Sequence, residues 1–160
     1  MPANDERFHL ETKFRIIRDW RTVERIIKGA TWFCLGIAGE SEPYVVPLDF
    51  GYENKSFYFH SDLKGYKLDL LKKNKEVSFT IVYDVDRRET PRTPCRTIYK
   101  SVMGKGTAHF VEDIEEKIRG LKAIMRQSVG SEYDFPPERA KTVAIVRVDI
   151  KSATGRQAGH

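Results

Sequence analysis

The chain of 160 residues is 40% apolar and 11% aromatic, which fits one globular domain with a single core. No apolar run approaches the roughly 20 residues of a membrane-spanning helix, and the polar N-terminus lacks a signal-peptide core, so we expect a cytoplasmic protein. The net charge of +5 would suit a nucleic acid, but basic and acidic residues are interleaved as on an ordinary solvated surface. Two cysteines, Cys34 and Cys95, indicate packing residues or free thiols rather than a disulfide.

The first predicted element is a short amphipathic helix near the N-terminus. Trp20, Val23 and Ile27 recur at helical spacing, Asp19 can cap the start, and Gly29 suits the end.

Three strand-like runs follow this helix and are separated by turn-rich segments. They span residues 31–38, 43–52 and 56–61 and predict an antiparallel meander.

The middle of the chain predicts a helix, a strand, a loop and a long strand. The helix has Leu63, Tyr66 and Leu70 on one face, and apolar residues alternate over 76–83. The charged, proline-bearing segment 84–97 reads as a loop, and 97–111 reads as a strand in which glycines mark a bend or bulge.

A second amphipathic helix, a last strand and a polar tail complete the chain. Ile114, Ile118, Leu121 and Met125 define the helix, the strand covers 142–150, and the tail runs to residue 160. Antiparallel strands interrupted by helices predict a closed or nearly closed β-barrel with helices on its rim. We expect a single domain over 1–160, with its core at about 31–150 and the N-terminal helix and C-terminal tail peripheral.

Proline in the middle of a strand-like run raises the question of a binding site. Pro47 has no N–H to donate, so it belongs on a sheet edge, at a bulge, or where the ladder is open. The backbone groups of Val46 and Leu48 then need partners, which the edge of a planar heterocycle would supply. Alternatively, Pro47 only protects an edge strand from aggregation.

A second candidate site follows at residues 60–67. His60 and Ser61 end a strand, and Lys64 and Lys67 fall at the start of the next helix, where the helix dipole disfavours cations. A phosphate would relieve that misfit, and Gly65 permits its close approach. The other reading is that both lysines point into water.

These segments resemble a known family. PYVVPLDFGY, YFHSDLKGYKLDLLKKN, EVSFTIVYD and the spacing of Cys95, Tyr99, Ser101 and Val102 look like the pyridoxamine phosphate oxidase-like FMN-binding split barrels, in the branch related to nitroimidazole-resistance proteins. The resemblance covers about 31–150. Tyr66 departs from it, because a basic residue is usual there.

The resemblance implies a mainly β fold with flanking helices, a split β-barrel of antiparallel strands, and a homodimer with FMN at the subunit interface. It implies that the backbone of Val45, Val46, Pro47 and Leu48 lines the isoalloxazine edge. His60, Ser61 and Lys67, with Gly65 beside them, would hold the ribityl phosphate. Tyr99 and Ser101 would complete the pocket.

The implied activity is the reduction of a small electron-poor substrate, such as a nitroaromatic compound, with electrons delivered to FMN. His60 is the one imidazole in the predicted pocket; it could supply a proton near neutral pH or serve only as a cofactor ligand. The sequence has no nucleophile with a paired base, no metal-ligand cluster of diagnostic spacing and no Gly-rich phosphate loop, so hydrolase and kinase interpretations have no support.

Three alternatives stay open. A flavin-storing or flavin-sensing module would bind the cofactor without turnover. A true pyridoxamine phosphate oxidase would need a second phosphate site, for which Arg87, Arg88, Arg92 and Arg96 of the predicted loop are the candidates. A basic oligonucleotide-binding barrel is the third.

Overall fold

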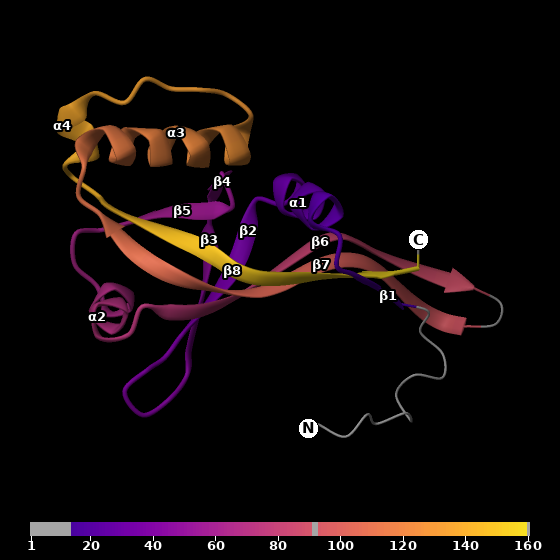
Figure 1. Cartoon of the computed structure of the whole chain (residues 1–160). Coiled ribbons are helices and arrows are strands. Elements are labelled where there is room, and N and C mark those ends of the chain that lie inside the picture. Colours follow the sequence, from indigo (N-terminus) through magenta and orange to yellow (C-terminus); the bar gives the residue numbers. More distant parts are fainter. Residues whose placement is uncertain (1–13, 91–92, 160) are drawn as a thin grey trace.

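The computed structural model describes residues 14–90 and 93–159 (Figure 1). The chain order of the elements in this part is as follows: β1 (Phe14–Ile17), α1 (Trp20–Gly29), β2 (Trp32–Ile37), β3 (Tyr44–Asp49), β4 (Gly51–Glu53), β5 (Ser56–Ser61), α2 (Tyr66–Lys73), β6 (Glu76–Thr90), β7 (Thr93–Val111), α3 (Ile114–Val129), α4 (Pro137–Ala140) and β8 (Ala144–Ala158).

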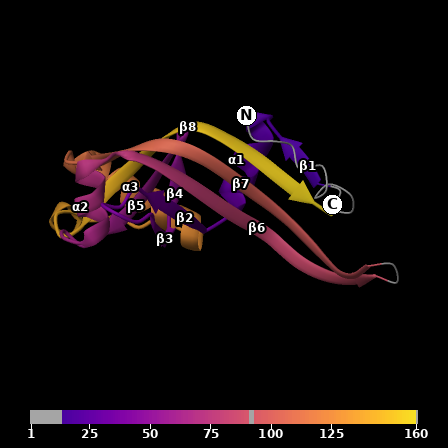
Figure 2. The same cartoon turned by 90° about the horizontal axis from the view of Figure 1, so that it is seen from below.

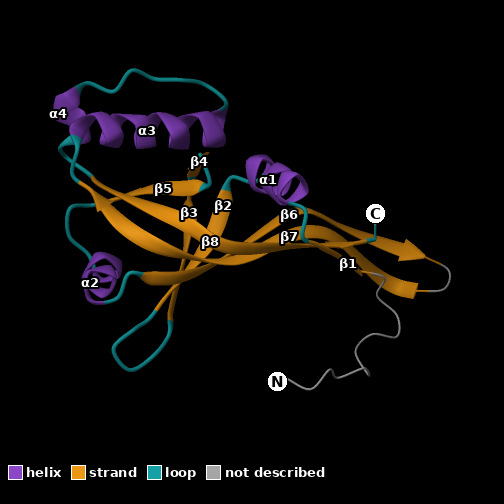
Figure 3. Ribbon diagram, viewed as in Figure 1, coloured by secondary structure: helices purple, strands orange, loops and turns teal. Residues whose placement is uncertain are grey.

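The strands form one antiparallel sheet in the order β3-β2-β6-β7-β8-β5-β4, with β1 added to β8. Only Phe50 separates β3 from β4. The chain therefore joins the two ends of this strand order, because it runs beside β2 as β3 and then beside β5 as β4. The sheet wraps into a barrel with a seam along β3, which confirms the predicted split β-barrel with flanking helices (Figure 3).

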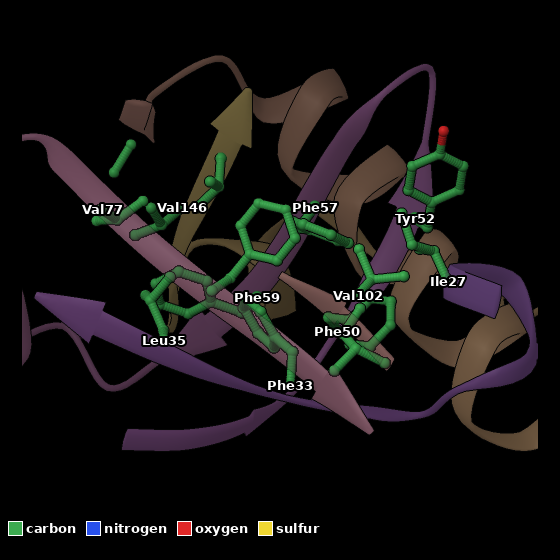
Figure 4. Close-up of a cluster of buried hydrophobic side chains, with 14 of the residues drawn as sticks. Ile27, Phe33, Leu35, Phe50, Tyr52, Phe57, Phe59, Val77, Val102 and Val146 are labelled. Atoms are coloured by element: carbon green, nitrogen blue, oxygen red, sulfur yellow. The ribbon is translucent and has the colours of Figure 1, made fainter. Parts of the chain in front are cut away.

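Aromatic side chains fill the barrel (Figure 4). Phe57 lies 5.2 Å from Phe33, 5.2 Å from Phe50 and 4.8 Å from Phe79, measured between ring centroids. These rings are at most 3% exposed. Edge-on aromatic pairs contribute about 0.5–1.5 kcal/mol each beyond their buried area, so this cluster gives the barrel a rigid interior.

The two longer helices follow the predicted patterns. The Asp19 carboxylate caps α1 by accepting from the Thr22 N–H at 3.0 Å, and Asp113 caps α3 in the same way. In Figure 1, α3 covers the β4 and β5 end of the sheet and α1 lies over β6 and β7. None of the helices in residues 14–90 and 93–159 is long and apolar enough to cross a membrane.

The buried face predicted for α2 is wrong. The helix begins at Tyr66 and buries Leu68, Leu70 and Leu71. Leu63 precedes it and is 56% exposed, and Tyr66 is 55% exposed. The spacing of four residues between Tyr66 and Leu70 predicts that both lie on one buried face of the helix. In the structure, the side of α2 that packs against the barrel carries Leu70 but not Tyr66.

The described part of segment 84–97 is not a loop. β6 and β7 continue through it as an antiparallel hairpin, with Arg87 opposite Thr97 and Arg88 opposite Arg96. Figure 2 shows this arm extending far beyond the helices. A register shift next to Asp84, whose φ is 56°, marks the passage from barrel to arm. Long-range pairing overrides the loop-like composition here. Arg92 and the side chains of Cys95 and Arg96 lie outside the described residues.

The predicted polar tail after residue 150 is wrong, because β8 continues to Ala158. A bulge in β8 leaves Lys151 unpaired, since Lys105 lies opposite Ser152 while Gly106 lies opposite Ile150. The sequence pattern missed the continuation because the bulge breaks the alternation. It also missed β1 and α4, whose four residues each carry no periodic signal.

Candidate functional site

An open groove of about 710 Å³ lies on the outer face of the sheet. Residues from β1, β2, β3, β6, β7 and β8 line it. Its volume is within the range of small-molecule and cofactor sites. Five hydroxyl side chains line the groove: Ser78, Thr80, Ser101, Ser152 and Thr154.

Gly36 keeps the floor of the groove flat. A Cβ atom on Gly36 would lie 2.6 Å from the Ser78 Oγ, so the bare backbone leaves space against which a flat ring can lie. Gly104 has a different role, because a Cβ atom there would lie 2.3 Å from the Ser152 carbonyl oxygen and 2.4 Å from the buried Phe79 ring on the barrel side of β7.

The bulge at Lys151 builds one wall of this groove. Before it, Val146 and Val148 point into the barrel. Beyond it, the even-numbered residues face the other way, so that Ser152 and Thr154 line the groove together with Arg156. One inserted residue thus converts an inward-facing series into a ligand-facing series.

The structure places Pro47 on a sheet edge. β3 pairs with β2, with Pro47 opposite Cys34, and lies at the end of the strand order. The other edge of β3 pairs with no described strand and faces the seam of the barrel. Val45 is 63% exposed and lines the groove, whereas Val46 and Leu48 are half-buried. Cys34 is a free thiol beside them.

The predicted phosphate residues lie at the end of β5 and the start of α2. The His60 Nε2 atom is 4.0 Å from the Asp49 Oδ2 atom at the end of β3, too far for a hydrogen bond. At the other end of β3, Tyr44 packs edge-on against Tyr66 with 5.3 Å between ring centroids. The Tyr44–Tyr66 contact thus holds the start of β3 beside α2, while the end of β3 lies close to the end of β5.

The Ser61 hydroxyl is the most informative polar atom of this region. It is buried and has no hydrogen-bond partner among the described residues. A buried hydroxyl without a partner costs about 1–3 kcal/mol, so such atoms in native proteins call for a bound partner.

The start of α2 is also open to a ligand. Gly65 is the N-cap and gives the helix no side-chain cap. No described atom lies within 4 Å of a Cβ built on Gly65. Lys67 is half-buried and Lys64 exposed, and neither forms an ion pair with a described residue. Free N–H groups and uncommitted cations together suit a phosphate.

The predicted residues thus fall into two groups on one chain. Val45 and Ser101 both line the groove, and Tyr99 lies two residues before Ser101 on β7, outside the lining. His60, Ser61, Gly65 and Lys67 gather at the seam and do not line the groove.

Sequence reasoning missed much of the groove, in particular Gly36, Met103, Lys105, Ser152 and Thr154. Two features of the sequence could have indicated the groove: Gly36 within β2, and the alternation of Ser152 and Thr154 near the C-terminus.

Comparisons with known proteins agree with this geometry. The family model described as pyridoxamine 5'-phosphate oxidase matches residues 19–157. The chain belongs to this family. No curated protein matches it.

Among solved structures, this chain is similar to a Bacteroides thetaiotaomicron protein that is described as a candidate 5-nitroimidazole antibiotic resistance protein. The identity is 30% and the TM-score 0.81, with 94% of this chain and 93% of that chain covered. An FAD-binding protein of Mesorhizobium loti shares the fold at 21% identity and a TM-score of 0.68, covering 92% and 99% of the two chains. An FAD and heme binding protein of Mycobacterium smegmatis also shares the fold, at 10% identity and a TM-score of 0.76, with 91% of this chain and 74% of that chain covered.

Proposed function

We propose that this family member is an FMN-dependent oxidoreductase that reduces small electron-poor substrates such as nitroaromatic compounds, and that it acts as a homodimer with FMN at the subunit interface. The buried, unpartnered hydroxyl of Ser61, a few residues before two lysines that form no ion pair with a described residue, carries the proposal. The likeness to a protein connected with nitroimidazole resistance supports the substrate class.

The residues at the seam fit the phosphate of FMN. The Ser61 hydroxyl would donate to a phosphate oxygen, Lys67 would add a charge-assisted hydrogen bond, and the N–H groups after Gly65 would point at the same anion. Tyr66 supplies no positive charge, so Lys64 and Lys67 together would replace the basic residue usual at its position.

The open edge of β3 fits the ring. The backbone groups of Val46 and Leu48 would hydrogen-bond the polar edge of a flavin at the open edge of β3. The backbone of Pro47 between them then points to the opposite edge, so its missing N–H is a donor withheld from β2 and not from the ring.

A second copy of the chain would complete the site. Around the groove, Val45 and Met103 are each 63% exposed and Ile16 is 45% exposed, which is apolar surface of the kind that a subunit interface covers. Because Tyr99 and Ser101 do not gather with His60 and Ser61, we assign them to the pocket formed across the dimer.

The cofactor supplies two electrons, and the protein supplies position, charge and exclusion of water. The balanced reaction is that a nitro group takes two electrons and two protons to give a nitroso group and water. His60 is the imidazole at the seam and is 46% exposed at its side chain. Its Nε2 atom can either give a proton or hold the cofactor, and its position beside the phosphate residues favours the second role.

A pyridoxamine phosphate oxidase activity has weaker support. Its second phosphate site would need several basic residues together, but Arg156 and Lys105 are the basic residues that line the groove in the described part of the chain, Arg87 and Arg88 lie on the arm, and Arg88 is paired with Asp86 at 2.8 Å. A flavin-storing or flavin-sensing protein is the main rival, since it would use the same binding residues.

Anaerobic reoxidation separates these functions. The flavin-loaded protein is reduced with dithionite and mixed with a neutral nitroaromatic compound such as nitrobenzamide, and the return of the oxidised flavin absorption is followed. We expect reoxidation well above that of free reduced FMN, with one nitroso equivalent per two electrons. A rate equal to that of free FMN would favour storage or sensing.

A further inference from the structure

The charges along the groove are all of one sign. Lys105 of β7 and Arg156 of β8 are its charged lining residues in the described part of the chain, and no Asp or Glu of that part lines it. The five hydroxyls that share the lining can all donate hydrogen bonds. A groove of this chemistry favours a ligand that carries acceptors and negative charge.

Lys105 lies at the opposite end of the groove from Ser101. The two residues are four positions apart on β7, which corresponds to about 13 Å along a strand. The Lys105 side chain faces the groove with Ser101 and Met103, because alternate residues of a strand point to one side. It is exposed and forms no ion pair with a described residue.

Its neighbour Lys151 shows the contrast. Lys151 is the extra residue of the β8 bulge, lies outside the groove lining, and pairs with Glu76 at 2.5 Å. The bulge thus leaves one lysine committed to a carboxylate of the protein and a second lysine, Lys105, available to a ligand.

We propose that Lys105 makes this site selective for substrates that carry a carboxylate on the ring to be reduced. This inference rests on the proposed function and adds the substrate class. The ammonium group binds the carboxylate at one end of the groove, and the hydroxyls of Ser78 and Ser152 offer donors beside it. A neutral substrate of the same shape leaves the ammonium without a partner.

The test compares 4-nitrobenzoate with 4-nitrobenzamide, which have similar shape and differ in charge. With the flavin-loaded protein reduced beforehand by dithionite, as in the reoxidation assay, we expect the second-order rate constant (kcat/KM) for the benzoate to exceed that for the benzamide by about tenfold or more, the scale of one charge-assisted hydrogen bond. Lys105→Met abolishes this ratio while kcat/KM for the benzamide stays within about twofold, and Lys105→Arg restores most of it.

Lys151→Met is the matched control, because it removes the same charge from the same face of the chain outside the groove. It leaves the ratio unchanged. A wild-type ratio near one, or a ratio that falls equally in both methionine variants, contradicts the inference.

Binding without turnover keeps the inference separate from the proposed function. Calorimetric titration of the flavin-loaded protein with benzoate and with benzamide needs no nitro group. Benzoate binding that depends on Lys105 supports the inference even if neither nitro compound is reduced. Loss of FMN affinity in Lys105→Met would overturn it, because the lysine would then serve the cofactor.

Discussion

At the scale of single residues, the unpartnered hydroxyl of Ser61 allows cofactor binding to be tested separately from the stability of the protein. Its Oγ has no partner among the described residues, whereas Ser56 at the other end of β5 donates to the Asp149 carboxylate at 2.8 Å. Of these two buried serines on one strand, the protein itself satisfies Ser56 but not Ser61.

Ser61→Ala should therefore weaken FMN binding by about 0.5–1.5 kcal/mol and leave the flavin-free protein as stable as the wild type or slightly more stable. Ser56→Ala should do the opposite, lowering stability and leaving FMN affinity unchanged. Fluorescence titration and thermal unfolding of the flavin-free protein measure both. A flavin-free Ser61→Ala protein that is markedly destabilised would contradict the account.

Lys67 provides a second residue-scale test. Lys67→Ala should reduce FMN affinity by about 1.5–3 kcal/mol, as expected for a lost charge-assisted hydrogen bond. Lys72, at the end of the same helix and 3.6 Å from Asp69, is the control. Equal FMN affinity in the two variants would remove Lys67 from the site.

Single residues were predictable from the sequence where chemistry and local position coincide. Pro47 indicates a sheet edge because it has no backbone N–H to donate. His60 to Lys67 lie together because they are close in the chain. Gly104 and Ser152 meet only through the pairing of β7 with β8, which no local pattern encodes.

At the scale of elements, α3 holds the end of α1 in place. The Gln127 side-chain Nε2 lies within hydrogen-bonding distance of the carbonyl oxygens of Ile27 at 3.1 Å, Lys28 at 3.2 Å and Ala30 at 2.5 Å, and its two hydrogens can serve two of them at a time. It thereby supplies donors at the end of α1, where the Ile27 carbonyl also accepts from the Ala30 N–H at 3.2 Å.

Gln127→Ala should lower the free energy of unfolding by about 1–3 kcal/mol, because partly buried carbonyls lose their donor. Ser128→Ala, at an exposed position one residue on, serves as the control. Urea unfolding of the two variants distinguishes them. Equal stability would show that water replaces the amide without cost.

A charged network joins α3 to the sheet. Arg147 of β8 donates to Asp149 at 2.8 Å and to Glu116 of α3 at 2.5 Å, and Asp149 also accepts from Ser56. Burial tends to raise the pKa of Asp149, but hydrogen bonds from Arg147 and Ser56 outweigh it and lower that pKa.

This lowered pKa predicts acid sensitivity. The stabilisation by Asp149 is fully present above the unfolded-state pKa of about 3.9 and is lost as pH falls through the lower pKa of the folded state. Asp149→Asn should therefore lower stability at pH 7 and show a flatter decline below pH ~4. Exposed Asp62→Asn should keep the wild-type profile in urea unfolding at each pH.

Elements were predictable from the sequence when their periodicity was regular. α1, α3 and the strands of the barrel followed the pattern, whereas the arm of β6 and β7 was read as a loop because its charges hide the alternation. The extension of β8 was missed because the Lys151 bulge interrupts the series.

At the scale of the whole molecule, the account requires a second copy on the groove face. Met103 is 63% exposed in the groove, and Val129 is 62% exposed at the end of α3. Met103→Glu should give a monomer that has lost most of its FMN affinity, while Val129→Glu should stay dimeric and loaded. Light scattering after gel filtration measures the masses. A wild-type mass equal to the 18.5 kDa chain would refute the dimer.

The split barrel was predictable as a whole because the family motifs occur in the right order, but the division of the site into a seam and a groove was not. That division depends on which faces of β3 and β7 are left open, and this follows from the closure of the barrel.

The most direct test of a flavin site is the visible absorption spectrum of the purified protein, followed by chromatography of what heating releases. We expect the two-band flavin spectrum and about one FMN per chain in the supernatant, with Ser61 and Lys67 variants retaining less. A colourless protein that also takes up no added FMN would contradict this expectation.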